Sequence, residues 1–468
     1  MPTANLQLLP RPAADTESDG PPRVAFVTLG CKVNQSDTQA AIGAFRGAGF
    51  RLVPPGEAAE VYVVNTCSVT GMADSKSRAW LRRMARANPG ALVVATGCYA
   101  ASGADALAEM PEVGLVVTPR HGDELLRLVL DHLPLEVRTR ATNKHSALRT
   151  PHSAILWAAD AAAGMRTRAM VKVEDGCNDF CTFCIIPFTR GMPRSTPTRL
   201  VLERVRARLA GGAREIVLTG VHMGKYGTDH AQRVRAAADP EEAPDLPSLV
   251  ERVLLGTDVP RLRLTSLEPT DAEMMLPVFA HPTAASRLAR HLHLPLQSGC
   301  DATLARMRRD YTTAGYAHIV RAVREAVPDI GITTDLIVGF PGETEEEFEA
   351  TCRFVSDLGF SGVHVFPYSA RPGTPAATMP GQLDPQTRHA RHARVTEIGA
   401  RGHEAVATRM LGRVLPVLWE EVDDTGARGL TDNYLRVRAG RPVAYNSITP
   451  ARIVAFDAEG LLAEPLGA

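Results

Sequence analysis

Three cysteines lie within eight residues of one another in the segment 174–191, EDGCNDFCTFCIIPFTRG. Cys177, Cys181 and Cys184 follow the spacing C-x3-C-x2-C. Thiolate is the preferred ligand of iron–sulfur clusters, and a loop this short can turn three sulfurs toward one face of a cluster. No fourth ligand follows at a comparable spacing. The pattern therefore predicts a metal centre with one open coordination position.

Zinc is the main alternative for this cysteine set. A closed zinc site takes four ligands in a tetrahedral arrangement, and a zinc ribbon usually offers a second close pair of cysteines. The chain has no second C-x2-C pair, and neither His152 nor His222 stands at a recognisable ligand spacing. The spacing favours a cluster over structural zinc.

A second set of cysteines follows three β-branched runs, RVAFVTLGC, VYVVNTC and LVVATGC, which end at Cys31, Cys67 and Cys98. Helical patterns fill the intervals, as is typical of βαβ units in a parallel sheet. Ligands bind beyond the carboxyl ends of such strands, which lie about 5 Å apart, so three thiols can converge there. Any one of these cysteines could be an ordinary buried apolar residue. Their shared position indicates joint metal binding, again with three ligands.

The strand and helix patterns around these cysteines predict an α/β protein of three domains. Residues 1–22 are expected to be a disordered extension, 23–138 an open parallel α/β domain, 139–168 a linker, 169–404 a partial parallel (β/α)6 barrel, and 405–468 a small antiparallel β-barrel. The second cysteine set belongs to the α/β domain, and the triplet follows the first strand of the partial barrel. Chemistry in such barrels takes place at the carboxyl ends of the strands. Its six expected strands span 169–173, 215–219, 261–265, 291–296, 332–338 and 362–367.

Charge and composition limit the classes of partner. The 468 residues include 52 Lys plus Arg and 52 Asp plus Glu, so any nucleic-acid contact must use local patches. No run of 18 apolar residues and no apolar signal segment occurs, which predicts a cytoplasmic protein with no membrane partner. In that reducing compartment, eight cysteines favour metal or redox chemistry over disulfides.

Two segments are candidates for RNA contact. The stretch DSKSRAWLRRMARANPG predicts a helix capped by Asp74 or Ser75, with Arg78, Arg82 and Arg86 recurring on one face. Such a stripe could bind phosphates or could simply be solvated. In the last domain, Tyr434 and Arg436 combine an aromatic ring with a cation, as single-stranded RNA contacts often do. Tyr434 could instead fill the core of the small barrel.

The strings TLGCKVNQSDT, NTCSVTGMADSKSR, EDGCNDFCTFCIIPFTRGMPRS, LPLQSGCDATLARMRRDYT and GLTDNYLRV resemble the radical S-adenosylmethionine methylthiotransferase family. The resemblance implies an N-terminal cluster domain, a radical S-adenosylmethionine barrel and a C-terminal TRAM barrel that contacts RNA. It implies that Cys31, Cys67 and Cys98 hold an auxiliary [4Fe-4S] cluster. It also implies that Cys177, Cys181 and Cys184 hold the cluster that generates a 5′-deoxyadenosyl radical.

The family activity implied is methylthiolation at C2 of adenosine 37 in the anticodon stem-loop of tRNA. Two molecules of S-adenosylmethionine and an electron donor would be consumed. GCKVNQ and NTCSVTGMADSKSR are typical of the branch that modifies N6-threonylcarbamoyladenosine. The alternatives are the same reaction on N6-isopentenyladenosine, methylthiolation of a ribosomal protein, and a noncatalytic iron–sulfur protein that binds RNA.

Candidate contacts to S-adenosylmethionine follow from the barrel rule and from the resemblance. Phe183 directly precedes the last cysteine of the triplet. The glycines around Gly220 could admit the cofactor or could form a plain turn. Side chains at the strand ends could hydrogen-bond the ribose or the amino acid part, and the backbone near a later glycine could approach the adenine. The residues so predicted are Phe183, Gly220, Glu268, Gln297, Ser298 and Gly339.

Overall fold

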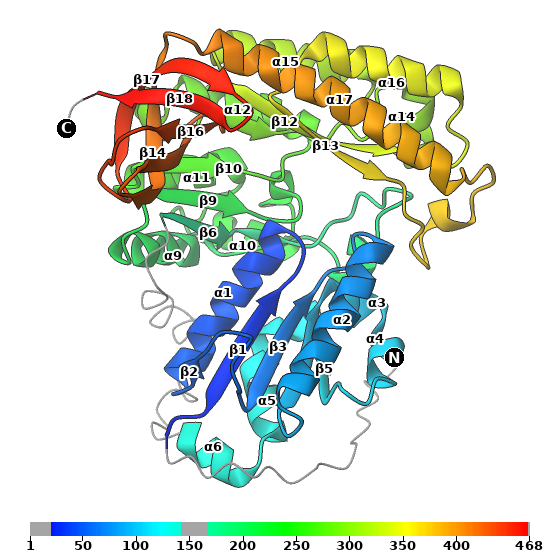
Figure 1. Cartoon of the computed structure of the whole chain (residues 1–468), viewed down its shortest axis with the longest axis vertical. Coiled ribbons are helices and arrows are strands. Elements are labelled where there is room, and N and C mark those ends of the chain that lie inside the picture. Colours follow the sequence, from blue (N-terminus) through cyan, green and yellow to red (C-terminus); the bar gives the residue numbers. More distant parts are fainter. Residues whose placement is uncertain (1–19, 142–166, 467–468) are drawn as a thin grey trace. The chain divides into compact units, whose positions relative to one another are not determined.

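The computed structural model of the chain describes residues 20–141 and 167–466. These residues form two compact units (Figure 1). The first consists of 20–141 with Gly176–Asn178 and Ile185–Met192, and the second of the remainder. Most of the expected extension and linker, and His152, lie outside the described residues. Among the described helices, none is both long and apolar enough to cross a membrane.

The first unit is built on a parallel sheet with the strand order β2-β1-β3-β4-β5, which confirms the open parallel α/β fold. Its central strand is buried on both faces, because alternate side chains enter two separate cores. Val61 and Val63 pack with Phe45, whereas Tyr62 and Val64 pack with Leu81. The elements are β1 (Arg23–Thr28), α1 (Lys32–Gly47), β2 (Arg51–Leu52), β3 (Val61–Thr66), α2 (Gly71–Ala87), β4 (Leu92–Gly97), α3 (Cys98–Ser102), α4 (Ala104–Ala108), β5 (Leu115–Val117), η1 (Pro119–Glu124), α5 (Leu125–His132), α6 (Leu135–Ala141) and α8 (Ile186–Thr189).

The second unit contains the six expected parallel strands, in two three-stranded sheets of order β10-β9-β6 and β11-β12-β13. An isolated parallel bridge joins Leu262 of β10 to Leu288, three residues before β11. β11 is shorter than expected, since Pro295 has no N–H to continue the ladder. The elements up to the last strand are β6 (Arg168–Lys172), β7 (Glu174–Asp175), β8 (Arg194–Ser195), α9 (Thr198–Ala210), β9 (Glu215–Thr219), η2 (Met223–Lys225), α10 (His230–Ala238), α11 (Leu246–Gly256), β10 (Arg261–Leu264), α12 (Pro269–Ala280), α13 (Pro282–Arg287), β11 (His291–His293), α14 (Asp301–Met307), α15 (Thr313–Ala326), β12 (Gly331–Val338), α16 (Glu345–Leu358) and β13 (Gly362–Pro367).

The two faces of these six strands differ in chemistry. Leu218, Leu262 and Leu336 belong to one large core shared with the surrounding helices. Their neighbours along the strands point to the opposite, inner face, where polar side chains predominate. The inner face of β9 to β13 carries Glu215, Arg261, Arg263, His291, His293, Thr333, Asp335 and His364.

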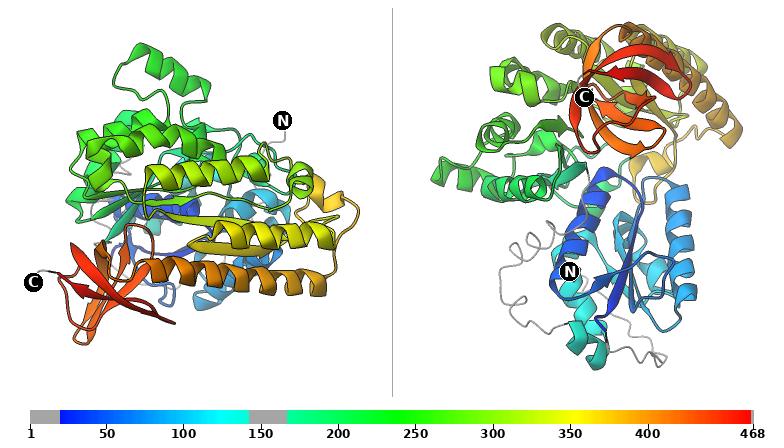
Figure 2. Two further views of the ribbon diagram at one scale, coloured as in Figure 1. Left: turned by 90° about the horizontal axis from the view of Figure 1, so that it is seen from above. Right: turned by 60° about the vertical axis from the view of Figure 1, so that its left-hand side comes forward.

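The chain ends in a closed barrel of order β14-β15-β16-β18-β17, seen at the end of α17 in Figure 2. It differs from the expected antiparallel barrel in one pair, since β16 and β18 are parallel. A closed barrel with an odd number of strands cannot alternate direction all the way round. The expected boundary at 404/405 falls inside α17, whose last turn packs into the barrel core through Val406 and Ala407. The elements are η3 (Pro375–Thr378), α17 (Pro385–Arg409), β14 (Val414–Asp423), β15 (Gly426–Thr431), β16 (Arg436–Ala439), β17 (Ile448–Asp457) and β18 (Gly460–Pro465).

A buried ion-pair network joins this small barrel to the inner face of the partial barrel. Glu215 is fully buried and pairs with both Arg261 and Arg263. Burial alone would raise the pKa of Glu215, but the two guanidinium groups hold it down at about 2. Arg263 also donates to the carbonyl oxygens of Asp432 and Thr431, at 3.0 and 3.2 Å.

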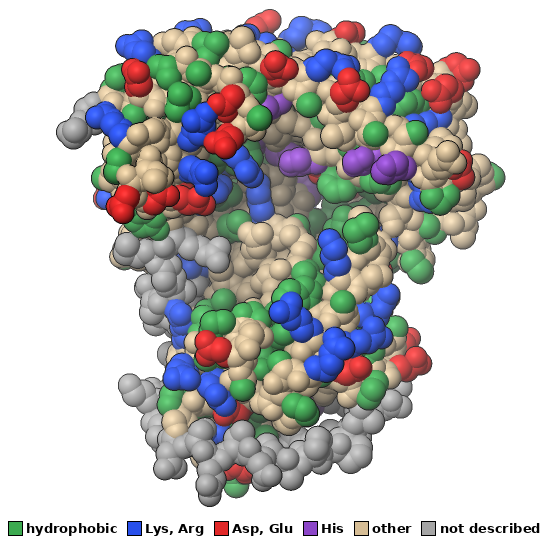
Figure 3. All heavy atoms as spheres, in the orientation of Figure 1, with side chains coloured by type: hydrophobic (Ala, Val, Ile, Leu, Met, Phe, Trp, Pro, Cys, Tyr) green, Lys and Arg blue, Asp and Glu red, His purple; other side chains and the backbone are tan. Residues whose placement is uncertain are grey.

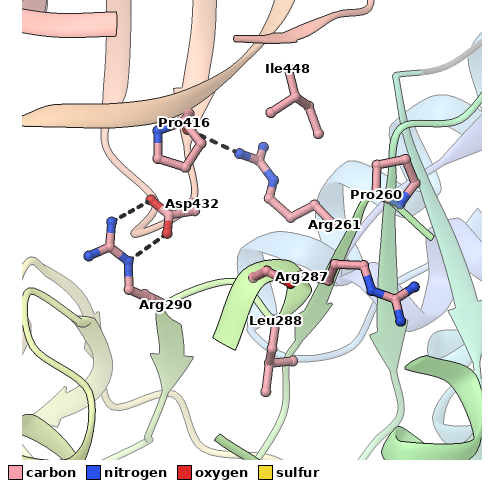
Figure 4. Close-up of a pocket in the computed structure, with 9 residues that line it drawn as sticks. Pro260, Arg261, Arg287, Leu288, Arg290, Pro416, Asp432 and Ile448 are labelled. Atoms are coloured by element: carbon pink, nitrogen blue, oxygen red, sulfur yellow. Dashed lines mark hydrogen bonds and ion pairs between the residues drawn. The ribbon is translucent and has the colours of Figure 1, made fainter. Parts of the chain in front are cut away.

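Two further contacts complete this joint. Arg290 holds the carboxylate of Asp432 through Nε at 2.6 Å, and Arg261 reaches the carbonyl of Pro416 (Figure 4). The ring of Tyr434 stacks on that of His291 with centroids 4.3 Å apart. The loop between β15 and β16 thus forms one end of the partial barrel.

We expect Arg263→Met to lower the free energy of unfolding of the second unit by about 3–5 kcal/mol, because it removes one partner of a buried ion pair. Urea unfolding of the apoprotein, followed in a variant whose sole tryptophan is Trp419, measures this change. The exposed Arg436→Met is the control and should change stability by less than about 0.5 kcal/mol. Equal effects of the two substitutions would show that the joint does not contribute.

Candidate functional site

The thiols of the first unit lie at the carboxyl ends of three neighbouring parallel strands. Cys31, Cys67 and Cys98 follow β1, β3 and β4, which are adjacent in the sheet. Burial, together with the nearby thiols of Cys98 and Cys31, raises the pKa of Cys67 to about 11. Burial also raises the pKa of Cys98. The sheet therefore brings the three thiols together, as the order of the strands predicts.

Two glycines allow these strand ends to pack closely, and one asparagine links them by hydrogen bonds. Gly30 has φ +95°, and a Cβ there would lie 2.8 Å from Cys67 Sγ. Gly97 has φ +88°, and a Cβ there would lie 2.3 Å from the carbonyl oxygen of Thr66. Both positions therefore require glycine. Asn34 donates to the carbonyls of Leu29 and Thr66, at 2.8 and 2.9 Å, and so ties the first strand end to the second.

A buried arginine completes this site. Arg190 is 1% exposed and belongs to Ile185–Met192, which packs as part of the first unit. Its Nε donates to Cys98 Sγ at 3.3 Å, and Nη2 donates to Asn34 Oδ1 at 2.7 Å and to Asp37 Oδ2 at 2.9 Å. A fixed cation beside three thiols favours their thiolate form. The donor set and the crowded glycine fit an iron–sulfur cluster held by Cys31, Cys67 and Cys98.

The C-x3-C-x2-C loop is held at both of its ends. Gly176 has φ +93°, and a Cβ there would meet the carbonyl oxygen of Met192 at 2.2 Å. The next residue, Cys177, donates its N–H to the carbonyl of Gly191 at 3.0 Å. In the second unit, the N–H of Thr182 donates to the carbonyl of Met307 at 3.1 Å, and the hydroxyl of Thr182 donates to the carbonyl of Arg306 at 2.9 Å. Cys181 and Cys184 flank this anchored threonine.

Arg309 is a site residue that spacing did not reveal. Its Nη1 donates to Cys181 Sγ at 3.2 Å, its Nη2 pairs with the carboxylate of Glu268, and its guanidinium stacks on the ring of Tyr311 at 4.9 Å. The sequence shows Arg309 within the family-like string MRRDYT, but no periodicity links it to a cysteine 128 residues away. It joins the cysteine loop to the residue that caps α12.

Four predicted cofactor contacts follow the ends of four strands. Gly220, Glu268, Gln297 and Gly339 come after β9, β10, β11 and β12. Gln297 has φ 63°, a strained conformation for a residue with a side chain, and such strain is common at ligand sites. Gly339 has φ +69°, and a Cβ there would lie 2.3 Å from Cγ of Arg388.

The other two predicted contacts lie differently. Phe183 packs edge-on against Phe340, with ring centroids 6.4 Å apart. Ser298 is fully buried, and its hydroxyl lies 3.3 Å from that of Thr351 on α16. Ser298 therefore faces a helix, whereas the backbone of Gln297 remains at the strand end.

Glu174 and His222 form an unexpected polar group beside Gly220. Burial raises the pKa of Glu174 to about 8. Its Oε2 accepts from the N–H of His222 at 2.9 Å, while its Oε1 has no hydrogen-bond partner in the described part of the chain. A Cβ at Gly220 would lie 2.8 Å from this carboxyl group. An unpartnered buried carboxyl oxygen in a space that admits only glycine fits a polar ligand group.

The ring of His222 is engaged on both nitrogens. Nδ1 lies 2.7 Å from Asp179 Oδ2, and Nε2 lies 2.9 Å from Asp271 Oδ2. Both ring nitrogens of His222 therefore face carboxylate oxygens.

Some of the residues predicted to contact RNA are exposed, and others are engaged within the protein. Helix α2 is capped by Thr70, whose hydroxyl accepts from the N–H of Ala73 at 3.2 Å, so the expected cap at Asp74 or Ser75 is wrong. Arg78 turns inward and donates to the hydroxyl of Tyr99 at 2.7 Å. Arg82 and Arg86 are exposed, as are Lys76 and Arg83, and basic side chains gather on this face in Figure 3. Tyr434 is held by His291 and Arg263 in the joint, while Arg436 is exposed.

Comparisons with known proteins match two parts of the chain to families. Residues 23–118 match the uncharacterized protein family UPF0004, and residues 171–355 match the radical SAM superfamily. The chain is 37% identical to the threonylcarbamoyladenosine tRNA methylthiotransferase MtaB of Bacillus subtilis, over 88% of this chain and 89% of that one. It is 33% identical to the protein of the same name from Aquifex aeolicus, over 89% and 96% of the two chains.

A relative with another substrate is similar over a comparable length. The tRNA-2-methylthio-N(6)-dimethylallyladenosine synthase of Methylobacillus flagellatus is 33% identical, over 88% of this chain and 92% of that one. The two family matches cover both cysteine sets. The chain therefore belongs to the radical S-adenosylmethionine methylthiotransferase family, and it is an enzyme that uses S-adenosylmethionine and a [4Fe-4S] cluster.

Proposed function

We propose that this enzyme converts N6-threonylcarbamoyladenosine at position 37 of tRNA, in the anticodon stem-loop, to its 2-methylthio derivative. The observation that carries the proposal is the presence of two separate three-cysteine sets, each at the carboxyl ends of parallel strands. Relatives from Bacillus subtilis and Aquifex aeolicus are named for this substrate, and they support the finer assignment.

The reaction explains the need for two centres. C2 of adenine is an unactivated aromatic carbon, which acid–base catalysis does not readily functionalise. When bound, the cluster at Cys177, Cys181 and Cys184 would supply the electron for reductive cleavage of S-adenosylmethionine, and the cluster at Cys31, Cys67 and Cys98 would serve sulfur transfer. The domains expected for these roles are 23–138 and 169–404.

The chain's own residues would then bind and orient. Arg309 holds Cys181 and Glu268 together, which supports a fixed geometry between the cysteine loop and the strand ends. The orphaned Oε1 of Glu174 would accept a hydrogen bond from a donor such as the ammonium group of S-adenosylmethionine. The backbone at Gly220 and Gly339, which follow β9 and β12, would line the cofactor site.

Contact with tRNA would use exposed cations. Arg82 and Arg86 on α2 are suitable for phosphates, and Lys76 adds to the same surface. In the second unit, Arg436 would supply a separate contact from the small barrel at 405–468, which we assign as a TRAM domain. With tRNA as substrate the enzyme would work in the cytoplasm, together with an electron donor of low potential.

A second candidate substrate is N6-isopentenyladenosine 37, which the relative from Methylobacillus flagellatus supports. The two nucleosides differ at N6, where one carries a carboxylate and a hydroxyl group and the other an apolar chain. The part of the enzyme that binds the N6 substituent must therefore be polar for one nucleoside and apolar for the other, while the chemistry at C2 is the same.

Deletion of the gene should remove the 2-methylthio form of N6-threonylcarbamoyladenosine from bulk tRNA and leave the unthiolated nucleoside in its place. Mass spectrometry of hydrolysed tRNA measures both, and complementation with the intact gene is the control. Loss of the isopentenyl form instead would select the second candidate. An unchanged nucleoside profile would contradict both.

Substitutions in the two cysteine sets should affect different steps of the reaction. With dithionite and S-adenosylmethionine, Cys177→Ala should abolish formation of 5′-deoxyadenosine, because the cluster that supplies the electron loses a ligand. Cys67→Ala should retain that cleavage but lose methylthiolation, and its iron content should fall from about eight to about four atoms per chain.

Chromatography of 5′-deoxyadenosine and of the nucleoside product reads both steps, and Cys300→Ala is the matched control. Absence of cleavage in the fully loaded wild-type protein would instead indicate a noncatalytic protein that binds RNA.

A further inference from the structure

A second type of ligand set lies on the inner face of the partial barrel, apart from the cysteines. The donor atoms of His293, Asp335 and His364 all lie within 4.8 Å of one another. Strand register explains the grouping, since Asp335 and His364 are direct partners across β12 and β13. His293 is the partner of Thr333, which stands two residues before Asp335 on the same face of β12.

Asp335 lies between the two imidazoles. His293 Nε2 is 3.3 Å from its Oδ2, and His364 Nδ1 is 3.1 Å from its Oδ1. Burial alone would raise the pKa of Asp335, but hydrogen bonds from the two histidines hold it well below its usual range. The group therefore combines one carboxylate with two imidazole nitrogens aimed at it.

A neighbouring hydroxyl orients one of these histidines. His293 Nδ1 lies 3.0 Å from Thr333 Oγ1, and the same oxygen lies 3.0 Å from His291 Nε2. In the neutral ring, a proton on Nδ1 donated to Thr333 would leave Nε2 able to ligate an ion in place of its contact with Asp335. Histidines that ligate metals almost always have their second nitrogen engaged in this manner.

The group is open to solvent on one side. The side chain of His364 is 61% exposed, that of Asp335 28% and that of His293 17%. Leu292 and Leu336, which alternate with these residues, are buried in the core under the helices. An ion could therefore reach the three donors from the inner face and would keep coordination positions free.

We propose that His293, Asp335 and His364 bind a divalent first-row transition-metal ion. Two imidazoles and one carboxylate suit zinc or iron(II), and three protein ligands leave positions for water or for an oxygen-bearing ligand. The site is distinct from both cysteine sets, and its occupancy does not depend on which nucleoside the enzyme modifies.

Zinc is the probe for the test, because iron in the same sample reports on the clusters. Tag-free holoenzyme with both cysteine sets loaded is exposed to excess zinc, desalted and analysed for both metals. The wild type should retain about one zinc ion per chain at this site. His364→Ala and Asp335→Asn should each lose that ion without losing iron. His389→Ala, an exposed histidine on α17, should retain the zinc ion.

Thr333→Val tests the orienting contact. It should leave the zinc stoichiometry intact at saturation but weaken affinity about 10- to 100-fold in competition with a chromogenic chelator. Equal zinc retention by the wild type and His364→Ala, or loss of zinc in His389→Ala as well, would assign the ion to adventitious binding and overturn the proposal. Failure of the wild type to retain zinc would overturn it equally.

Discussion

The common edge of parallel strands is the geometric constraint on which the rest of this protein depends. In each unit, the loops that leave this edge carry the cysteines, glycines and carboxylates of interest. Parallel strands require crossover helices, so residues far apart in sequence, such as Cys31 and Cys98, must return to one place. The same arrangement buries the strands on the helix side and leaves the inner face of the second unit for polar groups.

Each of the two cysteine sites contains an arginine that donates a hydrogen bond to one cysteine sulfur. Arg190 donates to Cys98 and pairs with Asp37, and Arg309 donates to Cys181 and pairs with Glu268. In each case a guanidinium with a carboxylate partner touches one sulfur. Hydrogen bonds and positive charge at a cluster sulfur stabilise the more negative, reduced state, so these two arginines would raise the reduction potentials of the bound clusters.

The inner face of the partial barrel is divided along its length. At one end, Glu215 and Arg263 with the loop around Tyr434 form a closed, fully paired joint to the small barrel. His291 links this joint through Thr333 to His293, and the polar series continues to the exposed His364. Buried charges are tolerated at the closed end because every charge there has a partner, whereas at the open end His364 is exposed to solvent.

Sequence alone was sufficient for the elements whose pattern is local. The six strands of the partial barrel, the open parallel sheet and the cysteine positions follow from β-branched runs, turn residues and spacing. The sequence predicts helix α2 but not where it starts, because Thr70 and Asp74 are equally good caps on composition and only the backbone decides between them. The parallel pair of the small barrel was missed for a related reason, since closure is a property of all five strands together.

What only the tertiary structure decided was which distant groups meet. No spacing predicts that Arg309 contacts Cys181, that Tyr434 stacks on His291, or that ligand atoms of His293, Asp335 and His364 lie within 4.8 Å of one another. These contacts join residues tens to hundreds of positions apart, so their geometry depends on strand order and register. The sequence by itself determined the chemistry available at the strand ends, because the type and local spacing of cysteines and glycines are enough to predict metal ligands and tight turns. The fold determined which cations and carboxylates surround them, because side-chain encounters depend on the packing of the whole unit.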